Sequence, residues 1–211
     1  MEIEEWKTVF VNAGSFIIGL ILACGQLYTI LKMKKNEKEN KEKAEKPKNY
    51  GKQIKEESKY TVKIQEEIEE LRQILNADRV QVLEFHNGTD FSTRKGYKMD
   101  CTYETIRYGN ETAKSILQNY PTTLLPIFMS KLIESKQYFT PDIEELKQID
   151  MSTYAMKINM HVSSFYDVAL EDNGNIIGIL AVQYTEPKDL DEGQKAMIHA
   201  KKIIIEELLK S

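Results

Sequence analysis

The sequence predicts an α+β domain that follows a single membrane-spanning helix and a helical linker. Three observations lead to this prediction: an uncharged, mostly apolar run near the amino terminus, a helical stripe of apolar residues after residue 53, and alternating segments that flank an Asn-Gly pair. The 211-residue chain carries 29 Lys+Arg and 33 Asp+Glu, a net charge of -4. This balance argues against a general nucleic-acid-binding protein.

The apolar run extends from Thr8 to Leu31. At about 1.5 Å per helical residue, it is long enough to cross the roughly 30 Å hydrocarbon core of a bilayer. An acidic tail, residues 1–7, precedes the run, and lysines follow it directly at Lys32, Lys34, Lys35 and Lys38. Because lysines near a span are held in the cytoplasm, we expect a single-pass inner-membrane protein with its amino terminus outside and its carboxy-terminal domain in the cytoplasm.

Two other interpretations of this run remain open. A cleaved secretory signal would need a basic amino-terminal region, and this one is acidic. Lipidation of Cys24 after cleavage would place the domain on the opposite side of the membrane. Within the run, Ser15, Gly19 and Ala23 recur every four residues and share a helix face, on which a second helix can pack closely. This spacing favours a homodimer or higher oligomer, although small residues are common in membrane helices.

Residues 32–52 are rich in Lys, Glu and Asn and predict a solvated, charged linker that contacts the membrane surface. Residues 53–76 predict an amphipathic helix. Its apolar face contains Ile54, Thr61, Ile64, Ile68, Leu71 and Leu75. We favour a parallel coiled-coil dimer that carries a signal down from the membrane, and the alternative is a helix packed on its own domain.

The folded domain is predicted over residues 77–211. A first strand alternates over Val80–Phe85 and stops at His86-Asn87-Gly88, and a second candidate covers Met99–Tyr108. Residues 110–146 predict a helical and irregular region interrupted by prolines.

Two further strands and a helix complete the predicted domain. Met160–Leu170 and Ile176–Tyr184 alternate as strands, and Asn173-Gly174 between them is a strong hairpin signal. The acidic stretch Asp189–Glu192 begins a final amphipathic helix.

This order of elements resembles a GAF domain over roughly residues 54–209. The resemblance is carried by Leu75-Asn76-Ala77-Asp78-Arg79-Val80 before the first strand and by the hairpin Asn173–Tyr184. It implies an antiparallel sheet with helices on both faces. It also implies one of three roles: a sensor of small molecules such as cyclic nucleotides, a tetrapyrrole-binding domain, or a dimer module.

The resemblance places a ligand between the sheet and the irregular middle region. The candidate ligand-binding residues are Glu84, His86, Asn87, Tyr97, Asp100, Tyr103, His161, Ser163, Ser164 and Tyr166. Glu84 and His86 alternate onto one strand face, and Gly88 permits a turn. The alternative is that His86 and Asn87 fasten a loop through local hydrogen bonds.

The sequence gives little support for a metal site or a covalently bound cofactor, and no cofactor can be identified from it. Glu84, His86, Asp90 and His161 are ligand types, but no pair has the helical spacing of a zinc motif, so we expect no metal. Cys101 lies in a predicted strand and is interpreted as a buried structural cysteine. The pattern that marks cyclic-nucleotide-binding members of the family is absent.

We expect a protein that is not an enzyme, because the sequence contains no nucleophile elbow, no phosphate-binding glycine loop and no zinc-protease motif. The leading hypothesis is a membrane-anchored GAF-like small-molecule sensor. With no output module expected after the final helix, it would act through dimerisation or a protein partner. One alternative is a phage holin or lysis regulator, in which assembly of the membrane helices permeabilises the bilayer. Another is a ligand-free scaffold that recruits a partner.

Overall fold

The computed structural model describes residues 28, 29, 31–35, 50–90 and 95–210. Most of the predicted membrane span, with Ser15, Gly19 and Ala23, lies outside the described residues, as does most of the charged linker. Among the residues that are described, no helix combines the length and apolar character needed to cross a bilayer. Residues Ile54–Ser211 form one compact unit.

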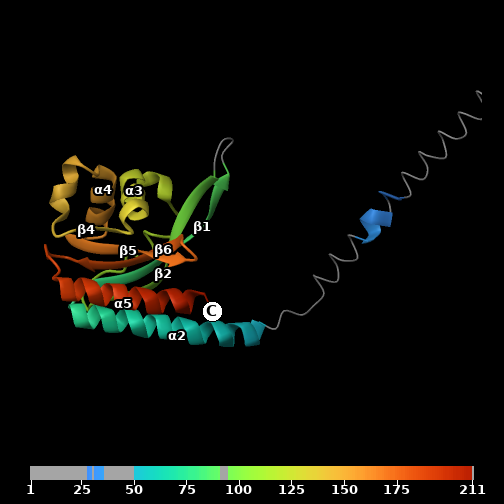
Figure 1. Ribbon diagram of the computed structural model, residues 1–211, viewed down its shortest axis with the longest axis horizontal. Helices are drawn as coiled ribbons and strands as arrows, with labels where there is room; N and C mark the ends of the chain where they lie inside the picture. The colour runs from blue at the N-terminus through green and yellow to red at the C-terminus, as the bar shows by residue number, and fades with distance from the viewer. Residues whose placement is uncertain (1–27, 30, 36–49, 91–94, 211) are drawn as a thin grey trace, which may run out of the picture. The chain divides into compact units, whose positions relative to one another are not determined.

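The compact unit is built on one six-stranded antiparallel sheet (Figure 1). Its strands lie in the order β3-β2-β1-β6-β5-β4, so β1 and β6 are central and β4 forms one edge. The strands are β1 (Arg79–Asp90), β2 (Lys95–Ile106), β3 (Tyr120–Pro121), β4 (Gln137–Thr140), β5 (Ser164–Asp172) and β6 (Asn175–Tyr184).

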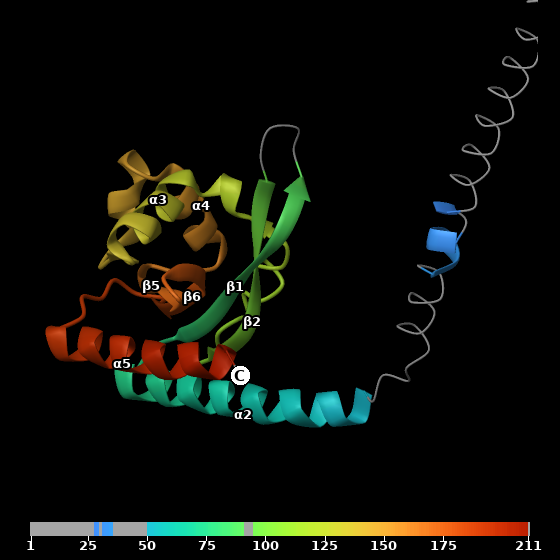
Figure 2. The same ribbon diagram turned by 45° about the vertical axis from the view of Figure 1, so that its right-hand side comes forward.

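Helices cover both faces of this sheet. Helices α2 (Tyr50–Leu75) and α5 (Glu192–Leu209) lie side by side on one face, as Figures 1 and 2 both show. The other face carries α3 (Pro126–Ser135), α4 (Met151–Asn159) and the short 3₁₀ helices η1 (Thr122–Leu124) and η2 (Ile143–Gln148). The predicted α+β class, with an antiparallel sheet between helices, is confirmed.

The apolar stripe of α2 belongs to the domain's own core. Ile64, Ile68, Leu71 and Leu75 are each at most 1% exposed and pack with the sheet residues Val80 and Val82 and with α5. Lys201 of α5 fixes the pair of helices through ion pairs at 2.5 Å to Glu67 and Glu70. The dimer seam favoured from the sequence is therefore wrong for these four residues, because a helical period does not distinguish a partner helix from a sheet.

Two local predictions are confirmed in detail. Asn173 and Gly174 both have positive φ, 49° and 81°, as a two-residue hairpin turn of type I′ requires. At the start of α5, Asp191 and Gln194 form a reciprocal capping box, in which each side chain accepts a hydrogen bond from the other residue's backbone N–H.

The boundaries of three predicted strands are wrong. β2 covers Lys95–Ile106 rather than Met99–Tyr108. β1 continues to Asp90 rather than stopping at His86-Asn87-Gly88, because β2 pairs with it beyond this point, with Asp90 opposite Lys95. The glycine marks a close approach instead, since a Cβ at Gly88 would lie 2.1 Å from the Gly96 carbonyl oxygen. β5 begins at Ser164, not Met160, because Met160 and His161 end α4, with His161 in a left-handed conformation at φ 56°.

The packing of α2 predicts a specific stability change. Replacing Ile68→Ala removes buried side-chain volume from the core beneath α2, so the free energy of unfolding should fall by about 2–5 kcal/mol. Chemical denaturation at several protein concentrations measures this value. The exposed neighbour Val62 on the same helix is the control, and Val62→Ala should change it by less than about 0.5 kcal/mol. A loss that grew on dilution would instead place Ile68 in an interface between copies.

Candidate functional site

The central pair of strands separates at one end of the sheet. β1 and β6 pair from Arg79 opposite Gln183 to Glu84 opposite Gly178, and no further pair joins them. Their last contact is tight, because a Cβ at Gly178 would lie 2.3 Å from the Leu83 carbonyl oxygen. Beyond it, the two strands diverge.

A β-bulge at Ile177 explains the separation. Leu170 of β5 pairs with Gly178, whereas the next residue, Glu171, pairs with Ile176, so Ile177 is an extra residue in β6. Such an insertion bends and twists the strand that carries it and commonly ends its pairing on one side. β1 has its own register shift against β2 between Asn87 and Asp90.

The separation opens into a hollow of about 590 Å³, here called the β1/β6 hollow. It is lined by Phe85, His86, Asn87, Tyr97, Thr122, Met129, Ile133, Asn175, Ile176 and Ile177. The lining is mostly apolar, and the described residues that form it include no Asp, Glu, Lys or Arg. A few polar groups in an apolar concave surface of this size are typical of sites for small organic molecules.

Two oxygen atoms lie near the His86 ring at the rim of the hollow. Its Nε2 lies 3.2 Å from Asp100 Oδ1, and its Nδ1 lies 3.2 Å from the carbonyl oxygen of Asn87. Asp100 in turn accepts a hydrogen bond from the backbone N–H of Asn119. The imidazole therefore lies between β1 and β2 at the rim of the hollow, and His86 is one of the residues that line it.

The other predicted site residues do not join this hollow. Glu84 lies on β1 one pair before the separation, and Tyr103 packs against the core beneath α2. His161 is exposed after α4, while the hydroxyls of Ser163 and Ser164 donate to the carbonyl oxygens of Thr185 and Glu186. These serines fasten a loop at the other end of the sheet.

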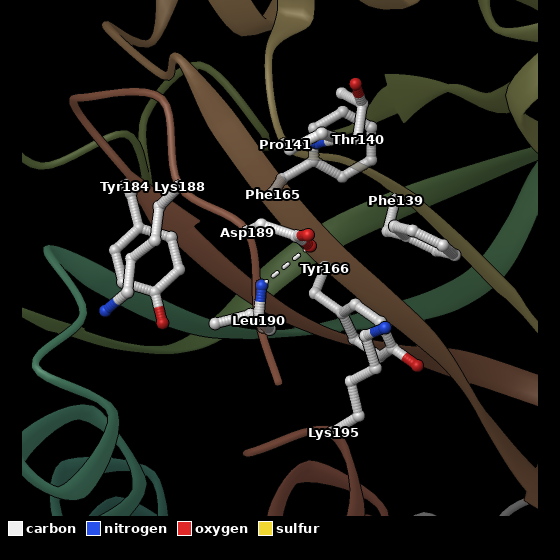
Figure 3. Close-up of a pocket in the computed structure, with 10 residues that line it drawn as sticks. All are labelled: Phe139, Thr140, Pro141, Phe165, Tyr166, Tyr184, Lys188, Asp189, Leu190 and Lys195. Carbon is white, nitrogen blue, oxygen red and sulfur yellow. Dashed lines mark hydrogen bonds between the residues drawn. The ribbon is translucent and has the colours of Figure 1, made fainter. Parts of the chain in front are cut away.

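Tyr166 lies in a separate small pocket between α5 and β4 (Figure 3). Its ring stacks on Phe139 at 5.2 Å, and its hydroxyl donates to Gln137 at 2.8 Å. The lysine Lys195 approaches the Phe139 ring to 5.4 Å. With about 10 Å³ of free space, this pocket is the size of one water molecule and is too small for a metabolite.

A shallow apolar groove of about 720 Å³ follows α4. It is lined by Ile116, Tyr120, Leu124, Met151, Ser152, Tyr154, Ala155, Met156, Ile158 and Asn159. The sequence analysis did not predict this groove.

The sequence analysis also did not identify four parts of the lining of the β1/β6 hollow: Thr122, Met129, Ile133 and the β6 residues. The β6 residues Asn175-Ile176-Ile177 could have been identified, because they directly follow the predicted hairpin turn. Within the described ranges, no three His, Cys, Asp or Glu side chains gather as metal ligands would.

Solved structures with the same fold are GAF domains. One structure similar to this chain is the blue-light-absorbing form of the PixJ GAF domain of Thermosynechococcus elongatus. The two are 16% identical, and the match covers 72% of this chain and 88% of the PixJ domain with a TM-score of 0.54. The photoproduct state of a GAF domain from Synechocystis matches at 17% identity over 71% of this chain and 92% of that chain, with a TM-score of 0.56. No protein-family model and no curated protein matches the sequence.

A third similar structure is the phycoerythrobilin-bound GAF domain of a cyanobacterial phytochrome. It shares 15% identity over 72% of this chain and 90% of that chain, with a TM-score of 0.53. At these identities the likeness concerns the fold, and the chain has the GAF fold that its element order resembles.

Cys101 is an inert thiol in the middle of β2. It is buried, and desolvation by burial, aided by the nearby Glu104 carboxylate, raises the pKa of Cys101 to about 12. Since the thiolate is the reactive form, this cysteine is not a nucleophile at neutral pH. The interpretation of Cys101 as a buried structural cysteine is confirmed.

The burial of Cys101 predicts its behaviour toward alkylating reagents. Iodoacetamide at pH 8 should leave Cys101 unmodified in the folded chain and modify it after denaturation, because unfolding removes the desolvation that suppresses the thiolate. Peptide mapping by mass spectrometry separates it from Cys24. Rapid modification of the native protein at Cys101 would contradict the burial described for β2.

Proposed function

We propose that this chain is a regulatory module that binds a small organic molecule in the β1/β6 hollow. The observation that carries the proposal is the hollow itself, because its volume of about 590 Å³ lies inside the range of about 300–1,000 Å³ usual for ligand pockets. His86, Asn87 and Thr122 supply the polar contacts that would orient a ligand on an apolar floor. No reacting group is required for such a role, and we propose a binding rather than a catalytic function.

The similar structures support a ligand-binding role in general. One of them is described as bound to phycoerythrobilin, and another, from R. palustris, as a chromophore-binding domain. A thiol-linked tetrapyrrole is not proposed for this chain, because Cys101 is buried and protonated at neutral pH. A non-covalent ligand is consistent with the mostly apolar hollow.

A structural change caused by ligand binding in the hollow would be transmitted to α2 through the sheet. The strands that border the hollow, β1 and β6, also carry Val80, Val82, Leu180 and Val182 in the core beneath α2. A change in the separation of β1 and β6 would therefore alter the surface on which α2 rests.

From the sequence alone, we propose that residues 8–31 anchor the chain in the inner membrane with the domain in the cytoplasm. Resistance of the full chain to alkaline extraction from membranes tests this proposal.

Helix α5 offers a surface for a second copy of the chain. Its outward face exposes Ala196, Met197, Ala200, Ile203 and Ile204. The nearby charges are paired at its flanks, where Lys202 binds Glu171 and Glu206. We propose that two copies pack here, so that a membrane-tethered dimer could transmit the state of the hollow. The holin-like alternative depends on residues 8–31, most of which lie outside the described residues.

The ligand proposal predicts a site-specific thermal shift. A metabolite that raises the melting temperature of the full chain should lose its effect in Ile133→Trp, because the indole would fill the mouth of the hollow. The matched control is Ile149→Trp, since Ile149 is 61% exposed and Ile133 is 56% exposed. If the two variants respond equally to every stabilising metabolite, the hollow is not the binding site.

The dimer proposal predicts a change in mass. Light scattering of the full chain in a mild detergent should give about twice the mass of one chain, and Ile203→Glu should shift the mass toward the monomer by burying a charge in the contact. The control Val62→Glu changes an exposed position on α2 and should leave the mass unchanged. A monomeric parent chain would exclude this dimer.

A further inference from the structure

The helical layer opposite α2 and α5 carries an exposed apolar surface. The groove along α4, here called the α4 groove, lies in this layer (Figure 1). Among its lining residues, Leu124 of η1 is 54% exposed, Met151 of α4 is 58% exposed and Ile158 of α4 is 47% exposed. The described residues therefore leave three large apolar side chains open on one side of the domain.

Helix α4 is apolar on both of its faces. Its inward face is fixed to the sheet by the buried Lys157 and by Met156, which belongs to the core. Its outward face carries Met151, Ala155 and Ile158, whose spacings of four and three residues place them in one row. A surface helix normally has polar residues on its outward face, so this row indicates that a second apolar phase covers α4.

The chemistry of the groove favours lipid over a protein partner. The described residues that line it include no Asp, Glu, Lys or Arg, so it offers a partner helix no charged group that would fix its register. Tyr154 lies in the lining, its hydroxyl donates to Glu144 at 3.1 Å, and the Lys147 Nζ lies 5.2 Å from the centroid of its ring. A tyrosine between apolar side chains and charged groups is typical of the boundary between hydrocarbon and water.

The chain outside the described domain supplies a bilayer within reach. The uncharged run Thr8–Leu31 ends shortly before α2, and residues 32–49 can span at most about 65 Å even when fully extended. A domain tethered at this distance meets the membrane surface at a high effective concentration, so a contact made by a few side chains is sufficient.

We propose that the α4 groove is a membrane-contact surface, on which Leu124, Met151 and Ile158 enter the boundary between the lipid headgroups and the acyl chains. This inference rests on the membrane anchor proposed above and specifies which face of the domain the anchor holds against the bilayer. The contact is apolar rather than electrostatic, because the groove lacks charged side chains. The face formed by α2 and α5 then points away from the lipid, where a second copy or a partner can reach it.

The test places a fluorescent reporter on each face of the domain. In full chains that carry Trp6→Phe, Ile158→Trp reports on the groove, and Ile74→Trp on α2 is the control, since Ile158 is 47% and Ile74 is 49% exposed. Each chain is reconstituted into phosphatidylcholine vesicles in which part of the lipid is brominated on its acyl chains. Quenching by the bromolipid should be at least about twofold stronger for Ile158→Trp than for Ile74→Trp.

Two further measurements check that the contact is apolar. Quenching of Ile158→Trp should persist from about 0.1 M to about 1 M salt, because no charge in the groove is available for screening. Adding Met151→Glu should reduce the quenching by at least about twofold, because a carboxylate is costly to place among acyl chains. The melting temperature of Met151→Glu in detergent should match that of its parent, since Met151 is exposed.

The other outcomes overturn the inference in distinguishable ways. Equal quenching at the two positions, in a chain that resists alkaline extraction, would overturn the contact surface and leave the anchor standing. A blue-shifted Ile158→Trp emission without quenching would show that a second copy of the chain covers the groove instead of lipid. Loss of quenching at high salt would replace apolar insertion by attraction to the headgroups. Release of the chain by alkali would overturn the anchor and this inference together.

Discussion

The fold depends on the placement of β1 between two apolar cores. Val80 and Val82 of this strand are buried beneath α2 and α5, while Leu83 and Phe85 pack beneath α3 and α4. Alternation of side chains along the strand allows one segment to supply both cores at once. Because β1 also pairs with β2 and β6, any change in its path alters both helical layers and the hollow between the strands.

Buried polar groups reinforce this arrangement. Lys157 of α4 and Asp167 of β5 form an ion pair at 2.7 Å, with both side chains 1% exposed, and the lysine Nζ lies 3.9 Å from the centroid of the Phe165 ring. Burial raises the pKa of Asp167 and lowers that of Lys157, and each charge opposes the shift of the other. Pairs of this kind add little net stability, but loss of one partner is costly, so the pair favours one position of α4 on the sheet.

A second polar network lies near the closed end of the central strands. Arg79 donates to Gln183 and to the carbonyl oxygen of Met160, and Gln183 donates to Gln81 at 3.1 Å. These contacts join β1 to β6 at the end opposite the hollow. Side chains therefore join the central pair of strands at one end, and a bulge in β6 ends their pairing at the other end, where the hollow lies.

The sequence by itself determined the elements whose signals are local. The Asn173-Gly174 turn, the acidic start of α5 and the alternation of β1 and β6 each depend on residues within a few positions of one another, and all are present. From the resemblance, His86, Asn87 and Tyr97 were also identified as neighbours of a pocket. Only the tertiary structure decided that the α2 stripe packs on its own sheet and that β1 leaves β6 after Glu84. Both outcomes depend on pairings between residues about a hundred positions apart, such as Leu83 with Ile179, and a hydrophobic period carries no information about which distant segment will cover it.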